Sequence, residues 1–222
     1  MSKPHISDQC YRYILLGCGL LLVAMELYKQ IFLFNIISHG HYNWWYFPFQ
    51  LCSIPMYLCI IIPFVHSKKY TLILCTFLQN FSILGGVMAL LFHSGLIYSY
   101  LRLTIHGFVW HILLILIGLL TCITQHSDSS IKGYLCTLYP YAFSCIIATV
   151  INIISPKAGG ADMFYISPYH PSTQFGFHYI AVTYGTLAGI LIYIIATCIG
   201  SLFVHLLCSL IATHILKSTS DF

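Results

Sequence analysis

Apolar stretches long enough to cross a lipid bilayer recur along the whole sequence. Of the 222 residues, 59% are hydrophobic and only 6% are charged, whereas a typical soluble domain carries about 25% charged residues. A soluble protein of this size would need more charge to cover its surface, and a lipid-facing surface needs none. The composition therefore excludes a cytosolic enzyme, a DNA-binding domain and a disordered chain, and it indicates an integral membrane protein.

The basic residues and the cysteines further limit the classes of protein to which this sequence can belong. The nine basic residues are scattered singly, apart from the pair Lys68 and Lys69, and do not form the patch that nucleic-acid binding requires, so we expect no nucleic-acid partner. The ten cysteines lie mostly inside apolar stretches without a CxxC pair, which is typical of small buried hydrophobes. The first apolar stretch is too long for a signal peptide and lacks a cleavage site, so we expect it to remain as a span.

About 20 apolar residues are needed to cross the hydrocarbon core, and six stretches of roughly that length occur. The predicted spans cover residues 13–34, 47–65, 70–92, 103–123, 135–154 and 177–198. The last apolar tract continues to residue 216, so residues 199–216 form either a seventh span, after a turn near residues 199–201, or an interfacial helix. We prefer six spans in one all-α, polytopic transmembrane helical bundle that occupies residues 1–222 as a single domain.

The distribution of lysine and arginine predicts the orientation of this bundle. With the N-terminus inside, the inner segments hold Lys3, Arg12, Lys68, Lys69 and Lys132, and with six spans also Lys217. The outer segments hold only Arg102 and Lys157. The positive-inside rule therefore favours an N-terminus on the inner side.

Under this topology, polar residues gather near the outer ends of the spans. They are Glu26, Gln50, Cys52, Ser53, His93, His106, His111, Asn152, Asp162 and His178. Ionisable groups at membrane depth are costly and usually face the bundle interior or a wet cavity. Their convergence predicts a cavity open toward the outer leaflet, with Glu26, Gln50, Asn152 and Asp162 as candidate substrate-binding residues.

Two features of this group allow alternative interpretations. Glu26 could form a self-paired interfacial cluster with Lys29 and Gln30, which follow it at i+3 and i+4. His106 and His111 are five residues apart, which places them about 140° apart around a helix. We therefore expect only one of these histidines at a common site, and we favour His106 because the following Gly107 permits a close approach.

Four motifs, in their order along the chain, resemble the YwaF family of bacterial integral membrane proteins. They are FPFQLCSIP at residues 47–55, GGVMALL at 85–91, LTIHG at 103–107 and GADMFY at 160–165. The YwaF family is similar to the transmembrane protein 164 group, which is associated with lipid acyl transfer through a cysteine and a histidine. The resemblance implies a multi-pass protein of the bacterial cell membrane.

Carried over to this sequence, the resemblance implies Cys52 as the catalytic nucleophile and His106, or its rival His111, as the base. The imidazole would remove the thiol proton, and the thioester would then pass its acyl group to a lipid hydroxyl. Glu26 and Asp162 are candidates to orient the imidazole, although Asp162 stands where the family more often has Asn. On this hypothesis the partner is a membrane lipid, and no cofactor is expected.

The sequence leaves two other functions open: a non-enzymatic transporter or binding protein for a small solute or metal, and a packing protein without chemistry of its own. Twelve histidines suit a zinc or copper site, but no HxxxH or HExxH pair occurs, so we expect no dedicated metal site. Below Cys52 and Asn152 the span interiors are nearly apolar apart from Gln79 and Asn80. This pattern argues against a complete permeation path.

Overall fold

The computed structural model describes residues 6–155, 160–174 and 176–220, and the side chains of these residues up to 213. That part of the chain is helical and contains no β-strand. Among these described residues, five helices are long and apolar enough to cross a membrane. They are α1 (Asp8–Phe32, continued by a π-helical turn over Leu33–Ile37), α3 (Lys68–Leu91), α4 (Leu101–Ile123), α5 (Ile131–Ile154) and α7 (Thr186–Ser220). The predicted all-α polytopic bundle is confirmed.

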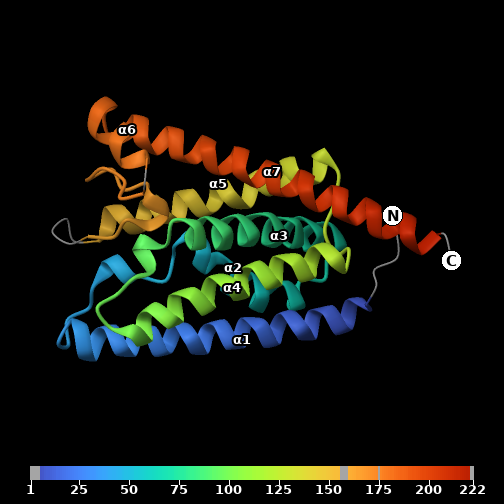
Figure 1. Ribbon diagram of the computed structural model, residues 1–222, viewed down its shortest axis with the longest axis horizontal. Coiled ribbons are helices and arrows are strands. Elements are labelled where there is room, and N and C mark those ends of the chain that lie inside the picture. The colour runs from blue at the N-terminus through green and yellow to red at the C-terminus, as the bar shows by residue number, and fades with distance from the viewer. Residues whose placement is uncertain (1–5, 156–159, 175, 221–222) are drawn as a thin grey trace.

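Helix α3 lies at the centre of the bundle, between α4 and α1 on one side and α5 and α7 on the other (Figure 1). Half of the most apolar 18-residue stretch of α3 is buried inside the protein, which is the largest share among the five long helices. Glycines bring α3 and α4 close together, because a Cβ on Gly86 would lie 2.8 Å from the His111 carbonyl oxygen and one on Gly118 would lie 3.0 Å from that of Gln79. Small residues at such crossings are typical of helix packing in membranes.

The segment predicted as a full span over residues 47–65 forms a shorter apolar helix, Leu51–Phe64. It consists of a 3₁₀ turn (Leu51–Ser53), α2 (Ile54–Ile61) and a second 3₁₀ turn (Ile62–Phe64). Its length of about 20–25 Å is less than the roughly 30 Å of a hydrocarbon core. Residues 47–50, between a 3₁₀ turn at Trp44–Tyr46 and the start of this helix, are not helical.

The last apolar tract is interrupted at Gly185 and not near residues 199–201. Helix α6 (Phe177–Tyr184) ends at Gly185, whose φ of 96° suits only glycine. Helix α7 then continues through residues 199–201 without a turn, and Gly200 packs against Leu84 of α3. The tract thus holds one long helix preceded by a short one, and the turn needed for a seventh span is absent from this described segment.

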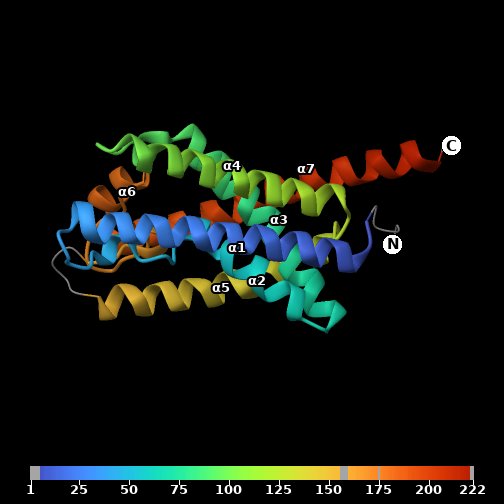
Figure 2. The same cartoon turned by 90° about the horizontal axis from the view of Figure 1, so that it is seen from below.

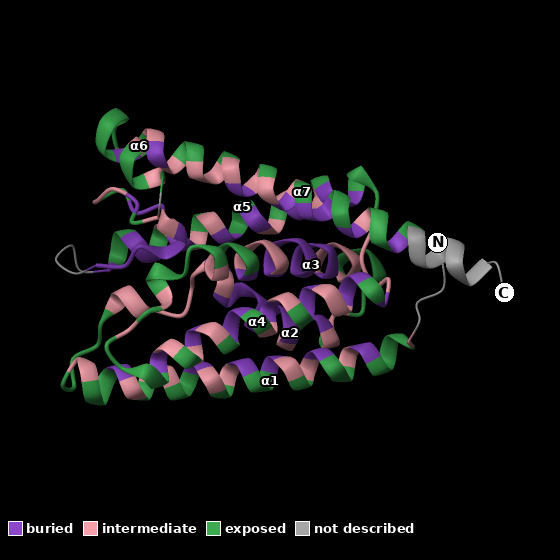
Figure 3. Ribbon diagram, in the orientation of Figure 1, coloured by how far each residue is buried: buried purple, intermediate pink, exposed green. Residues whose placement is uncertain are grey.

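Buried residues face the interior of the bundle, while the outward faces of the long helices are largely exposed, as Figure 3 shows. These outward residues are mostly large and apolar, for example Leu20, Ile31, Phe143 and Leu191. An apolar outer surface is what lipid requires. Arg12, Lys68, Lys69 and Lys132 lie near the starts of α1, α3 and α5. These helices begin toward the same end of the bundle, seen from a second side in Figure 2. Lys3, Lys157 and the Lys217 side chain lie outside the described residues, and the inward N-terminus stays a prediction.

Candidate functional site

A cavity of about 370 Å³ opens at the other end of the bundle, where α1 and α3 end and α4 begins. Its wall contains Cys52, His106 and His111 together with Lys29 and Gln50. Much of the remaining wall is aromatic and includes Trp45, Phe47, Phe92, Trp110, Phe177 and Tyr193. Both histidines border the cavity despite their angular separation, because it extends part of the way around α4.

Cys52 lies in the 3₁₀ turn that precedes α2. The indole nitrogen of Trp110 donates a hydrogen bond to the Cys52 carbonyl oxygen at 3.1 Å. Trp110 is buried on α4, one helical turn after His106 and next to His111. This bond holds the cysteine-bearing turn against the helix that carries both imidazoles.

Each imidazole donates one ring N–H to a backbone carbonyl oxygen. His106 Nε2 lies 3.0 Å from the Met25 oxygen, and His111 Nδ1 lies 2.7 Å from the Gly107 oxygen. A carbonyl oxygen only accepts, so these nitrogens carry the protons in the neutral rings. His106 Nδ1 and His111 Nε2 are then the nitrogens that can accept a proton. The His106 ring also stacks on Trp110, with ring centroids 5.8 Å apart.

Glu26 makes the contacts of the self-paired cluster. Its carboxylate lies 2.8 Å from Lys29 Nζ and accepts a hydrogen bond of 2.7 Å from Gln30 Nε2. Gln30 Nε2 also donates to the Tyr46 carbonyl oxygen. Glu26 is buried and does not line the cavity, whereas Lys29 does. The cluster therefore positions one ammonium group at the cavity wall.

Gln50 and Asn152 both bind the backbone of the loop between α5 and α6. Gln50 accepts a hydrogen bond from the Phe164 N–H at 2.8 Å and donates one of 2.7 Å to the Asp162 carbonyl oxygen. Asn152 accepts from the Met163 N–H at 2.7 Å and donates to the Met163 carbonyl oxygen at 3.0 Å. Gln50 lines the cavity and Asn152 does not. The two amides thus join the segment before α2, helix α5 and this loop.

The loop held by these amides has an uncommon backbone. Phe164 and Tyr165 have φ values of 57° and 56°, a left-handed conformation that bulky residues rarely adopt. Phe164 is fully buried, and Tyr165 lines the cavity. Irregular backbone at membrane depth is tolerated where protein buries it and satisfies its polar groups. The loop therefore serves as one wall of the cavity.

Asp162 is buried in the same loop but does not line the cavity. One carboxylate oxygen, Oδ1, accepts a hydrogen bond of 3.0 Å from the Ser167 N–H, while Oδ2 is buried without a hydrogen-bond partner in the described part of the chain. Burial raises the pKa of Asp162 from 3.8 to about 6, against the opposing effects of the Ser167 hydrogen bond and the nearby His170 ring. The structure does not place this carboxylate beside the α4 imidazoles.

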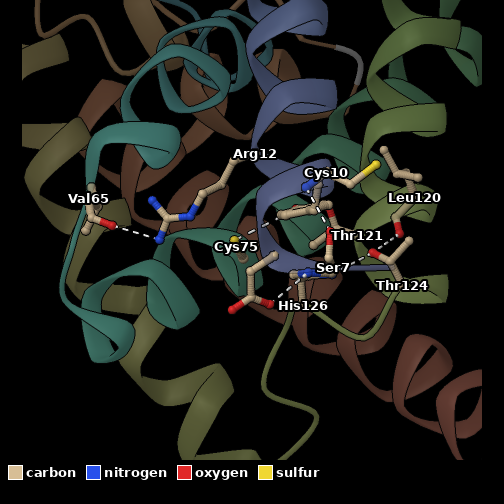
Figure 4. Close-up of polar contacts among 11 residues, drawn as sticks. Ser7, Cys10, Arg12, Val65, Cys75, Leu120, Thr121, Thr124 and His126 are labelled. Carbon is tan, nitrogen blue, oxygen red and sulfur yellow. Dashed lines mark hydrogen bonds and ion pairs between the residues drawn. The ribbon is translucent and has the colours of Figure 1, made fainter. Parts of the chain in front are cut away.

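A second polar cluster, which the sequence analysis does not identify, lies at the end where α1 begins (Figure 4). Arg12 donates to the carbonyl oxygens of Pro63 and Val65 at 2.7 and 2.9 Å, which binds the end of the Leu51–Phe64 segment to α1. The Tyr11 hydroxyl shares a hydrogen bond of 2.8 Å with Thr121. A single arginine near the end of an apolar stretch is the only sequence signal for this cluster.

The helices and the cavity define a multi-pass integral membrane protein with a pocket at one end of its bundle. The model of the TMEM164 family matches residues 2–197, and the chain belongs to this family. No curated protein and no solved structure matches it. The match confirms the expected likeness to the transmembrane protein 164 group, and the YwaF grouping stays a prediction. In the described residues, no group of three or more His, Cys, Asp or Glu side chains could hold a metal ion.

Proposed function

We propose that this protein transfers an acyl group to or from a membrane lipid, with the Cys52 thiol as nucleophile and an α4 histidine as base. The observation that carries the proposal is that Cys52, His106 and His111 border one cavity. A largely aromatic and apolar wall suits an acyl chain, and the Lys29 ammonium group at the rim suits a polar headgroup.

The proposed reaction has two symmetrical halves. The accepting imidazole nitrogen removes the Cys52 thiol proton, and the thiolate attacks the ester carbonyl carbon of the donor lipid. The carbon–oxygen ester bond breaks, the imidazolium protonates the departing lipid hydroxyl, and an acyl thioester remains on Cys52. In the second half, the imidazole removes a proton from the acceptor hydroxyl, which attacks the thioester and releases the thiol.

His106 is the preferred base, and its surroundings support a defined role. Its Nε2 is held by the Met25 carbonyl oxygen of α1, so Nδ1 is left to accept a proton. The hydrogen bond to α1 and the stacking on Trp110 fix the plane of the ring. His111 also donates to a carbonyl oxygen, that of Gly107 on its own helix, but through Nδ1, which leaves Nε2 to accept a proton. Measurement of the two histidine variants distinguishes them.

The experiment reconstitutes purified protein in vesicles that contain an acyl-labelled phospholipid and a lysophospholipid, with mass spectrometry of both lipids and protein. We expect acyl transfer and a hydroxylamine-sensitive acyl adduct on Cys52. Cys52→Ala abolishes the transfer and the adduct. Of His106→Gln and His111→Gln, the variant that removes the base lowers the transfer and the adduct.

Cys145→Ala is the matched control, because Cys145 is half-buried on α5 and does not line the cavity. It retains wild-type transfer. Transfer that persists in Cys52→Ala, or a wild-type protein with neither transfer nor adduct, overturns the proposal.

A further inference from the structure

A second cavity, of about 300 Å³, lies at the opposite end of the bundle between the first turns of α3 and α5. Its charged lining residues are Lys69, Lys132 and Asp128. The remaining wall consists of Leu72, Ile73, Thr76, Gly133 and Cys136. It shares no lining residue with the cavity that contains Cys52.

The acidic member of this site is engaged by the chain itself. Asp128 Oδ1 accepts a hydrogen bond of 2.9 Å from the Ser130 N–H, and its own N–H donates to Thr76 Oγ1 at 2.9 Å. The carboxylate packs against Gly133 in the first turn of α5, where a side chain would collide with it. The positive end of the α5 dipole offsets its charge.

The two lysines have no such partner. Lys69 and Lys132 are exposed, and neither forms an ion pair within the described residues. They occupy the second position of α3 and of α5, respectively, on the two sides of the cavity. The cavity therefore presents two ammonium groups against one carboxylate that is already hydrogen-bonded, and it favours an anion.

The surroundings of the cavity favour an amphipathic anion. Leu72, Ile73 and Cys136 extend its wall along α3 and α5, about one helical turn beyond the lysines. The adjoining surface is apolar as well, since Ile131 and Leu135 are 53% and 52% exposed. A groove with cationic groups at its rim and an apolar floor matches a phospholipid, whose phosphate lies at the interface and whose chain lies in hydrocarbon.

We propose that this cavity binds an anionic phospholipid, with the headgroup phosphate between Lys69 and Lys132 and one acyl chain along the groove between α3 and α5. The site is separate from the proposed acyl-transfer cavity and does not depend on it. A free phosphate ion would gain only the two lysines, whereas the lipid also covers the apolar wall.

The test measures retention of phosphatidylglycerol and of phosphatidylcholine on the detergent-purified protein by native mass spectrometry. Wild type prefers phosphatidylglycerol, and the Lys69→Gln/Lys132→Gln variant loses that preference by about tenfold or more. Lys68→Gln is the matched control, because Lys68 is an exposed lysine in the same turn and does not line the cavity. It binds like wild type.

Two further variants separate lipid binding from general charge effects. Cys136→Trp fills the groove and keeps both lysines, so phosphatidylglycerol retention falls. Asp128→Asn keeps the oxygen that accepts from Ser130 and removes the negative charge, so retention rises. Equal retention by the double variant and Lys68→Gln overturns the proposal, as does displacement of phosphatidylglycerol by millimolar inorganic phosphate.

Discussion

Trp110 binds the backbone of Cys52 through a hydrogen bond of 3.1 Å from its indole nitrogen to the carbonyl oxygen. The two residues belong to α4 and to the 3₁₀ turn before α2, which come together only in the folded bundle. Because Trp110 lies between His106 and His111 on the same helix, this contact sets the position of the cysteine relative to both imidazoles. The geometry of the proposed reaction therefore depends on a residue that takes no part in its chemistry.

Trp110→Phe tests this dependence. Phenylalanine keeps an aromatic ring in the core but cannot donate, which leaves a partly buried carbonyl oxygen without its partner at a cost of about 1–3 kcal/mol. We expect a lower unfolding temperature and a several-fold lower rate of acyl transfer. Thermal unfolding in detergent and the vesicle assay measure the two effects. Trp44→Phe, which does not line the cavity, serves as the control, and equal transfer by both variants would contradict the prediction.

Asn152→Leu should destabilise the loop that forms one wall of the cavity. The change removes both hydrogen bonds to Met163 and leaves its buried N–H without a partner, whereas its carbonyl oxygen keeps the bond from the Ile166 N–H, for a loss of about 1–3 kcal/mol. Chemical unfolding measures the loss. Asn35→Leu is the control, because Asn35 is exposed and its amide bonds only to its own helix. Similar unfolding free energies for the two variants would show that Asn152 does not hold the loop.

Asp162→Asn should stabilise the protein at neutral pH. The pKa of Asp162 is raised to about 6 by burial, so the folded state binds its proton more tightly than the unfolded state does. The resulting stability is complete below the ordinary pKa of 3.8 and is lost as the pH rises through 6. At pH 7 asparagine removes the buried charge and retains an acceptor for Ser167, a gain on the order of 2–3 kcal/mol.

The measurement is the unfolding midpoint of wild type and Asp162→Asn between pH 4 and pH 8, the range that brackets the raised pKa of about 6. The gap between the two proteins should widen as the pH rises across this interval. A gap that stays constant with pH would mean that the Asp162 carboxyl group does not titrate in the folded protein with a raised pKa.

Arg12→Lys should weaken the attachment of the short Leu51–Phe64 segment to α1. The guanidinium group binds the carbonyl oxygens of Pro63 and Val65 together, and a lysine ammonium group cannot reproduce this planar fork. We expect a loss of about 1–2 kcal/mol in the free energy of unfolding, measured by chemical denaturation in detergent. The exposed Arg102 provides the control Arg102→Lys, which should be neutral. An unchanged free energy of unfolding in Arg12→Lys would show that Arg12 does not hold this segment against α1.

Long apolar stretches determine where the helices of this protein form, without any information about tertiary contacts. In lipid every backbone polar group must be satisfied within the chain, so an uncharged stretch of about 20 residues forms a helix wherever it lies in the sequence. The all-α membrane class, the family likeness and the enrichment of polar groups near one end all follow from such local information. The sequence also predicts Cys52 with either His106 or His111 as catalytic residues, but it gives none of the contacts of these side chains.

Packing between helices determines where the helices are interrupted and which distant residues meet. Glycines at 185 and 200 look alike in the sequence, yet Gly185 ends α6 with a positive φ while Gly200 lies inside α7 against Leu84. Likewise, the 3₁₀ turn at Cys52 meets Trp110, Gln50 meets the Asp162 loop, and Lys69 shares a cavity with Lys132, all across long separations in sequence. The axial shift and rotation of helices depend on close side-chain fit between neighbours, which no single apolar stretch contains.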